Sequence, residues 1–276
     1  MVIKTVKEIA VERAVECQAE VGARFKHSIG IVYGYDEGGK FIAYGSCVFL
    51  EVSGEKYLVT AAHVVDDAKQ YGFAIVGSAG VFQIADDFRV TSKIEGSRLK
   101  DKHDFAFLRL TTEILDSLGE AVAFIDSSEV SQNRGSMDGR QYLVLGFPAA
   151  KNNRLIDRQN NRLRPQPWSY LGTCTSIDAA TITRTGLSPD TNVAVKFDPD
   201  QVGNNDGVNT TPPDTHGVSG GALVDLGLAH PDNLSGESPC TGHLAGIMME
   251  MHKGEKLLVA VRIEHVLRAI KAEVSP

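Results

Sequence analysis

Short segments rich in valine, isoleucine, phenylalanine and tyrosine recur through most of the chain, with glycine, aspartate and serine between them. Regularly spaced short strands favour a β-sandwich or a β-barrel over alternating β–α units, so the pattern predicts an all-β fold. In the first half the expected strands are 28–35, 41–52, 56–60, 72–76, 104–110 and 122–125. In the second half they are 141–147, 168–176, 180–185, 193–197, 221–225, 243–249 and 257–262.

Both ends of the chain show a helical spacing of apolar residues. In residues 2–22 these residues are three and four positions apart, which predicts an amphipathic helix. That helix either packs on the protein's own β-structure or docks a regulatory protein partner. Residues 263–272 have the same spacing and predict a closing C-terminal helix.

Three short motifs carry residues suited to nucleophilic catalysis. Ser219 lies in a Gly-Val-Ser-Gly-Gly sequence, His63 ends an apolar segment, and Asp104 precedes another one. A serine hydroxyl needs a base to remove its proton, and a carboxylate on the other side of the imidazole orients that base. We therefore assign Ser219 as the nucleophile, His63 as the general base and Asp104 as the residue that orients His63.

The order His63, Asp104, Ser219 and the sequence around each residue resemble the trypsin/chymotrypsin-like serine peptidases, including their high-temperature-requirement branch. The resemblance implies two six-stranded antiparallel β-barrels with the active site between them, here with an N-terminal and a C-terminal helix added. It divides the chain into an N-terminal helical extension (1–24), a first barrel with His63 and Asp104 (25–130), and a second barrel with Ser219 and the C-terminal helix (131–276).

The glycine-rich motif also predicts an oxyanion hole. Gly217 can adopt backbone angles closed to other residues, which lets its N–H point into the cleft beside the N–H of Ser219. In trypsin-like zymogens the residue before the serine is an aspartate, which pairs with a newly cut N-terminus and so builds the hole. Here that residue is Val218, which cannot form the ion pair. We therefore expect the chain to need no N-terminal cleavage for activity.

Substrate preference is predicted less directly. By resemblance to the family, the residue six before the nucleophile forms the floor of the primary pocket, and that residue is the uncharged Pro213. We therefore do not expect the pocket to require arginine or lysine in the substrate, unless a shifted loop places the carboxylate of Asp214 at the pocket floor. His216 either lines the mouth of the pocket or stays solvated. Candidate wall residues, some of which face the core instead, are Met248, Met249 and Met251.

Composition excludes several other classes of protein. A net charge of −7 argues against general nucleic-acid binding, which usually requires a basic domain. The sequence has no apolar run of about 18 residues, so a membrane-spanning helix is not expected. It shows no ligand spacing typical of zinc or calcium sites, so we expect neither a metal nor a cofactor.

The cysteines and the N-terminus point to a reducing compartment. The N-terminal segment lacks the uninterrupted apolar stretch of a secretory signal, which predicts a cytoplasmic protein. Secreted trypsin-like relatives carry a cysteine directly after the catalytic histidine, whereas here that residue is a valine. We therefore expect four free thiols, those of Cys17, Cys47, Cys174 and Cys240.

Together these features predict a serine endopeptidase that hydrolyses peptide bonds through an acyl-enzyme. Too little chain follows Ser219 for a further peptide-binding domain, so we expect limited cleavage of a dedicated intracellular protein target. The expected partners are a protein or peptide substrate and a regulatory protein that docks on the N-terminal helix or on the basic insertion 151–164. The alternative is a proteolytically silent module that keeps the fold for binding or as a scaffold.

Overall fold

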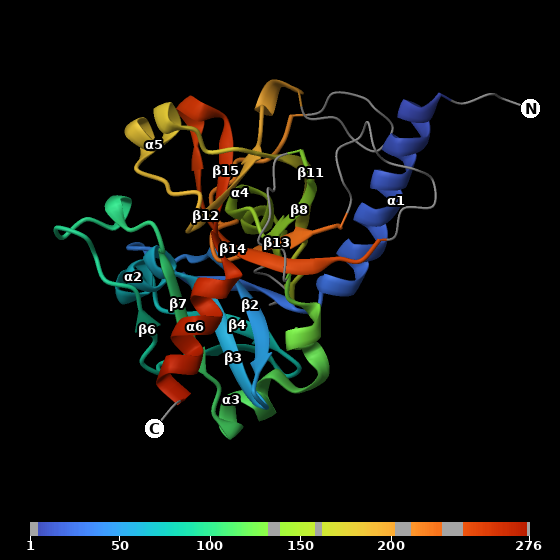
Figure 1. The fold of residues 1–276 in the computed structure, drawn as a ribbon. Helices are drawn as coiled ribbons and strands as arrows, with labels where there is room; N and C mark the ends of the chain where they lie inside the picture. The colour runs from blue at the N-terminus through green and yellow to red at the C-terminus, as the bar shows by residue number, and fades with distance from the viewer. Residues whose placement is uncertain (1–4, 132–138, 158–161, 202–210, 228–239, 275–276) are drawn as a thin grey trace, which may run out of the picture.

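The computed structural model describes residues 5–131, 139–157, 162–201, 211–227 and 240–274. These residues form two β-units, which occupy the lower and upper halves of Figure 1. The largest buried cluster takes side chains from both units and from the two terminal helices, for example Val48, Leu145, Phe25 and Val266. The two units therefore share one continuous apolar core.

The first unit is an antiparallel sheet of seven strands in the order β5-β4-β1-β2-β3-β7-β6. The β2–β3 hairpin turns at Ser53 and Gly54, both with positive φ, as a tight two-residue turn requires. The predicted all-β unit is confirmed, with seven strands in an open order in place of a closed six-stranded barrel. Its strands are β1 (Ile29–Tyr35), β2 (Phe41–Val52), β3 (Glu55–Ala61), β4 (Ala74–Gly77), β5 (Gly80–Gln83), β6 (Arg89–Val90) and β7 (Phe105–Arg109).

The second unit is a closed antiparallel barrel of six strands, as predicted, in the order β11-β12-β15-β14-β13-β8. A separate two-stranded hairpin lies between β8 and β11 in the sequence. The barrel strands are β8 (Gln141–Gly146), β11 (Trp168–Thr175), β12 (Asn192–Lys196), β13 (Ala222–Asp225), β14 (His243–His252) and β15 (Leu257–Arg262). The hairpin strands are β9 (Ile156–Asp157) and β10 (Arg162–Leu163).

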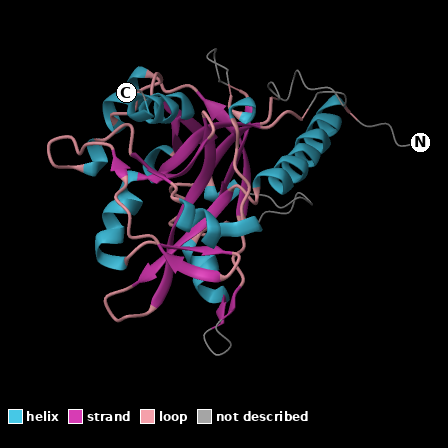
Figure 2. Ribbon diagram, turned by 90° about the horizontal axis from the view of Figure 1, so that it is seen from below, coloured by secondary structure: helices cyan, strands magenta, loops and turns pink. Residues whose placement is uncertain are grey.

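Helices flank the two β-units (Figure 2), and those predicted at both ends of the chain are present. The N-terminal helix α1 begins after Thr5, whose hydroxyl and the carboxylate of Glu8 form a capping box. Its buried side contacts β8 and β11 of the second barrel, so the helix packs on the protein's own β-structure. The helices are α1 (Val6–Phe25), α2 (Ala62–Tyr71), α3 (Thr112–Leu118), α4 (Ala149–Asn152), α5 (Ala179–Thr185) and α6 (Ile263–Val274).

Two of the predicted strands are not strands. Residues 180–185 lie in helix α5, because the Asp178 side chain caps the N-terminus by accepting the N–H of Thr181, and Gly186 ends the helix in the left-handed conformation. Residues 122–125 pair with the sheet through one bridge only, between Ile125 and Leu50. At residues 180–185 the capping of the helix at both ends therefore outweighs the β-propensity of the side chains.

The prediction of four free thiols is wrong, because Cys17 and Cys240 form a disulfide. The bond joins helix α1 to the segment that leads into β14, and Cys47 and Cys174 remain free and buried. The two bonded cysteines are 223 residues apart in the sequence, so no local spacing could reveal the pair. The argument from cysteine chemistry to a reducing compartment therefore loses its support.

In the described ranges, no helix combines the length and the apolar character needed to cross a membrane.

The disulfide should contribute measurably to stability. Linking two residues so far apart restricts the unfolded chain, which typically stabilises a protein by about 2–4 kcal/mol. We expect Cys240→Ser to lower the free energy of unfolding in urea by about this amount. Reductant should lower the stability of the wild type to that of the variant and leave the variant unchanged. Four reactive thiols in the unfolded, unreduced wild type would contradict the disulfide.

Candidate active site

His63 and Asp104 meet at one end of two adjacent strands. Strand β3 pairs with β7 through Ala61 and Phe105, so the residues just beyond this end of the ladder face each other. Asp104 Oδ1 accepts the backbone N–H of His63 at 3.0 Å, and Oδ2 lies 2.7 Å from Nδ1 of the same residue. The carboxylate therefore fixes both the backbone and the ring of His63, as the predicted orienting role requires.

The backbone at Asp104 adopts a left-handed conformation, with φ of 35°. Aspartate is one of the few residues besides glycine that visit this region. The side chain is buried, and its own carbonyl accepts the N–H of Ala62. The turn thus brings the carboxylate back over the start of α2.

The loop with Ser219 comes from the second barrel and packs directly against the first unit. The backbone N–H of Ser46 on β2 donates to the carbonyl of Ser219 at 2.8 Å. A side chain at Gly220 would place its Cβ 2.0 Å from the carbonyl oxygen of Ser46 and 2.2 Å from Oγ1 of Thr60. Only glycine permits this approach, which brings Ser219 beside the strand that leads into His63.

Within the described part of the chain, no hydrogen bond joins the Ser219 hydroxyl to the His63 imidazole. Catalytic hydrogen bonds of this kind are often long until substrate binds. The structure thus forms the His63–Asp104 pair and places the Ser219 loop against β2 and against β3, the strand that leads into His63.

The peptide between His216 and Gly217 is oriented for an oxyanion hole. The carbonyl of His216 accepts the N–H of Ala149 at 2.8 Å. Because the N–H and C=O of a trans peptide point in opposite directions, the N–H of Gly217 points away from Ala149. Gly217 has φ of 93°, and its N–H and that of Ser219 have no hydrogen-bond partner among the described residues. Two free donors in one turn are what an oxyanion hole needs.

Two sets of contacts hold this turn in place. The hydroxyl of Ser46 donates to the carbonyl of Gly217 at 2.7 Å and accepts the N–H of Phe147 at 2.9 Å. The side chain of Val218 is buried in the core of the second barrel, in the same cluster as Val144 and Met248. Val218 is thus held by apolar packing at the position where an aspartate is expected in trypsin-like zymogens.

Several charges act on the imidazole of His63. Burial by itself would lower the pKa of His63, but the hydrogen bond to Asp104 and the negative charges of Asp104, Asp67 and Glu250 raise it above its usual value. Asp67 lies one helical turn after His63 on α2, and Glu250 lies on β14. The carboxylates therefore stabilise the imidazolium form of His63.

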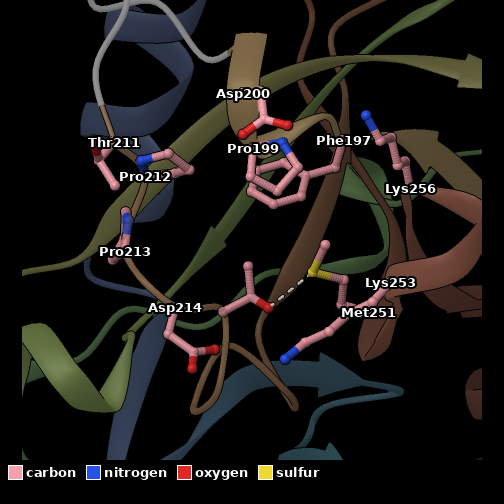
Figure 3. A pocket seen from close by; sticks show the side chains of 11 residues that line it. Phe197, Pro199, Asp200, Thr211, Pro212, Pro213, Asp214, Met251, Lys253 and Lys256 are labelled. Carbon is pink, nitrogen blue, oxygen red and sulfur yellow. Dashed lines mark hydrogen bonds between the residues drawn. The ribbon is translucent and has the colours of Figure 1, made fainter.

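A cavity of about 610 Å³ opens beside the nucleophile loop (Figure 3). Of the predicted substrate-binding residues, Pro213, Asp214 and Met251 line it, and Thr215 Oγ1 lies 3.5 Å from the sulfur of Met251. The other lining residues are Phe197, Pro199, Asp200, Thr211, Pro212, Lys253 and Lys256.

Three predicted substrate-binding residues lie elsewhere. Met248 and Met249 are each only 2% exposed and belong to the two cores that meet at β14. The ladder between β14 and β15 shifts register between Met248 and Glu250, so strict alternation of the methionines does not hold. His216 is exposed, with its backbone N–H bonded to Oδ1 of Asp214, and it does not line the cavity.

Sequence reasoning missed the residues that support the site. Ser46 braces the Gly217 turn, and Asp66, Arg98 and Asp101 surround the turn of Asp104. Asp66 follows His63 by three residues, a spacing that places two side chains on the same face of a helix. This spacing was the one signal in the sequence for the cluster. Across the described ranges, no group of three or more histidine, cysteine, aspartate or glutamate side chains could hold a metal ion.

The comparisons with known proteins agree with this geometry. The model of the trypsin-like peptidase domain matches residues 45–227, which is more than half of the chain. The chain belongs to the trypsin-like peptidase family. No curated protein matches the chain.

Solved structures show the same fold as this trypsin-like chain. The HtrA-type protease AlgW with tripeptide is 16% identical, with a TM-score of 0.53 over 94% of this chain, which spans only 64% of the AlgW chain. Neuropsin, a serine protease expressed in the limbic system of mouse brain, is also 16% identical, with a TM-score of 0.54 over 90% of this chain and 95% of its own. At this level of identity the likeness concerns the fold alone.

The charges around His63 predict a pH profile. Only neutral His63 can take the serine proton, so the rate of fluorophosphonate labelling should rise as the pH passes upward through the pKa of His63, above its usual value of about 6.5. Glu250→Gln removes a charge that raises this pKa, so the acidic limb should move to lower pH. Glu255→Gln is the matched control, because Glu255 pairs with Arg184 and is not among the charges that act on His63. An acidic limb at the same pH in Glu250→Gln and the wild type would contradict this electrostatic account.

Proposed function

We propose that this trypsin-like chain is a serine endopeptidase that works through an acyl-enzyme on Ser219. The observation that carries the proposal is the oriented peptide of Gly217, which leaves two backbone donors beside the nucleophile. An oxyanion hole stabilises the charge that develops in the transition state, and losing one donor typically costs about 2.7–4 kcal/mol. A silent scaffold has no need for free donors at this position.

His63 and Asp104 supply the proton transfer. His63 takes the proton of the Ser219 hydroxyl as the oxygen attacks the scissile carbonyl, and it returns the proton to the leaving amine. Asp104 holds the ring by the 2.7 Å contact at Nδ1, which leaves Nε2 for Ser219. Water then hydrolyses the acyl-enzyme with His63 again as base.

The proposal includes limited cleavage of a protein target under control of a regulatory protein partner. The apolar side of α1 is buried against the second barrel, so this side of the helix does not support docking. The basic insertion 151–164 remains the candidate surface, although its residues 158–161 lie outside the described part of the chain.

A fluorophosphonate probe tests the nucleophile. The wild type, still beginning at Met1 by intact mass, should be labelled at Ser219, if necessary after its partner is added. Ser219→Ala should fold normally and lose labelling, with turnover reduced by up to about 10⁶-fold. Equal labelling of the variant would exclude Ser219 as the nucleophile. Labelling that requires a cut near the N-terminus would contradict the role of Val218 packing.

The cavity supports a preference for large neutral side chains. Its lining combines apolar side chains, Pro213, Met251 and Phe197 among them, with charged residues of both signs, two aspartates and two lysines. Because carboxylates and ammonium groups both line the cavity, neither a cationic nor an anionic side chain meets a pocket of a single opposite charge.

Fluorogenic peptides that differ only before the scissile bond test this preference. Leucine, methionine or phenylalanine should give kcat/KM at least about ten-fold above lysine, arginine or glutamate. Pro213→Asp should shift the preference towards lysine and arginine, whereas Asp200→Glu, which conserves the charge, should not. A wild-type preference for arginine would instead assign the contact to Asp214.

A further inference from the structure

A partly buried ionic cluster connects the helix of His63 to the loop of Asp104. At its centre is Arg98, in a short 3-10 helix (Arg98–Lys100) on the segment between β6 and β7, with a side chain that is 13% exposed. All three nitrogens of its guanidinium make hydrogen bonds. Nε and Nη2 donate to Oδ2 of Asp66 at 3.1 and 3.0 Å, and Nη1 donates to Oδ2 of Asp101 at 2.7 Å. Nη1 also donates to the carbonyl of Thr91 at 2.7 Å.

One arm of the cluster holds helix α2. Asp66 lies three residues after His63, so a bond to its carboxylate fixes the first turns of the helix that carries the base. Burial by itself would raise the pKa of Asp66, but the hydrogen bonds from Arg98 and Lys93 lower it, which keeps the carboxylate ionised. Arg98 is the better placed of the two cations, because Lys93 is far more exposed.

The other arm holds the backbone at Asp104. Oδ1 of Asp101 accepts the N–H of His103, the residue directly before Asp104, at 3.0 Å. Its other oxygen binds Arg98 and accepts the hydroxyl of Thr91 at 2.6 Å. With its side chain 3% exposed, Asp101 is a rigid link between Arg98 and the left-handed turn at Asp104.

These contacts close a ring. It runs from His63 to Asp66 along α2, from Asp66 through Arg98 to Asp101, from Asp101 to the backbone N–H of His103 beside Asp104, and from Asp104 back to His63. We propose that Arg98 is a positioning residue that clamps the catalytic dyad by holding α2 and the Asp104 turn at a fixed separation. The proposal rests on the proposed peptidase function of His63, Asp104 and Ser219.

The chemistry of the clamp calls for arginine. A guanidinium is planar, stays charged, and presents its donors in a rigid fork that can bind two carboxylates at once. A lysine keeps the charge but has a single ammonium group, so it can replace the electrostatic part alone. Nε of Arg98 also lies 4.0 Å from Oδ1 of Asp104, which places positive charge beside the orienting carboxylate.

The first experiment measures Arg98→Met and Arg98→Lys with turnover normalised to probe-reactive sites. A displacement of about 1 Å at a catalytic group can cost about 100-fold in rate, so kcat of Arg98→Met should fall by about 10- to 100-fold. KM should change by less than about two-fold, because no substrate contact is lost. Arg98→Lys should recover part of kcat. The matched control is Arg109→Met, since Arg109 forms an exposed pair with Glu55 on the same unit and should leave kcat unchanged.

A double-mutant cycle separates positioning from general stability. If Arg98 acts through Asp104, Arg98→Met should have little further effect on the labelling rate in an Asp104→Asn background. Additive losses in the cycle, or an unchanged kcat per reactive site in Arg98→Met with only a lower melting temperature, would overturn the proposal. If Arg98→Met does not fold, Asp66→Asn is the second variant. It keeps the volume of the side chain and weakens the bond between Arg98 and helix α2, so it should give a smaller loss of kcat.

A spectroscopic test does not depend on peptidase activity. The Nδ1 proton of His63, bonded to Asp104, should give a low-field proton NMR signal that is assigned by its absence in His63→Gln. The signal should persist in Arg109→Met and should be lost or shifted in Arg98→Met. An unchanged signal in Arg98→Met would overturn the clamp. If the wild type shows the signal but never reacts with the probe, the proposed function fails while the clamp is still measured.

Discussion

The close approach of the Ser219 loop to strands β2 and β3 is the constraint on which the site depends. Gly220 touches the backbone of Ser46 and the hydroxyl of Thr60, at distances that exclude any side chain. The hydroxyl of Ser46 then binds the carbonyl of Gly217, so the same strand of the first unit also sets the orientation of the oxyanion turn. The loop with Ser219 is thus held by contacts between the two β-units, whereas His63 and Asp104 are bonded to each other within the first unit.

Charge around the dyad reinforces this arrangement. The first unit supplies Asp104 and Asp67, and the second unit supplies Glu250, so carboxylates from both sides act on His63. The cluster of Arg98 with Asp66 and Asp101 joins the elements that carry the two residues of the dyad. Partly buried groups of this kind interact more strongly than surface ion pairs, because water screens them less.

The fold combines a family framework with additions of its own. Helix α1 lies against the second barrel (Figure 1) and is tied to it by the bond between Cys17 and Cys240. Helix α6 contacts both β14 and β2, so it joins the two units on the side of the C-terminus. Val218 is held by apolar packing in the barrel core, at the position where an aspartate is expected in trypsin-like zymogens.

The sequence alone determined the fold class, most strand positions and the terminal helices, and it singled out His63, Asp104 and Ser219 as the proposed triad. Alternating apolar residues and glycine-rich motifs are local signals, and each acts within a few residues. Tertiary structure decided the disulfide, the helical state of residues 180–185, the burial of Met248 and Met249, and the cluster around Arg98. These features depend on which distant segments meet and on a register shift in β14, and neither is recorded in local spacing.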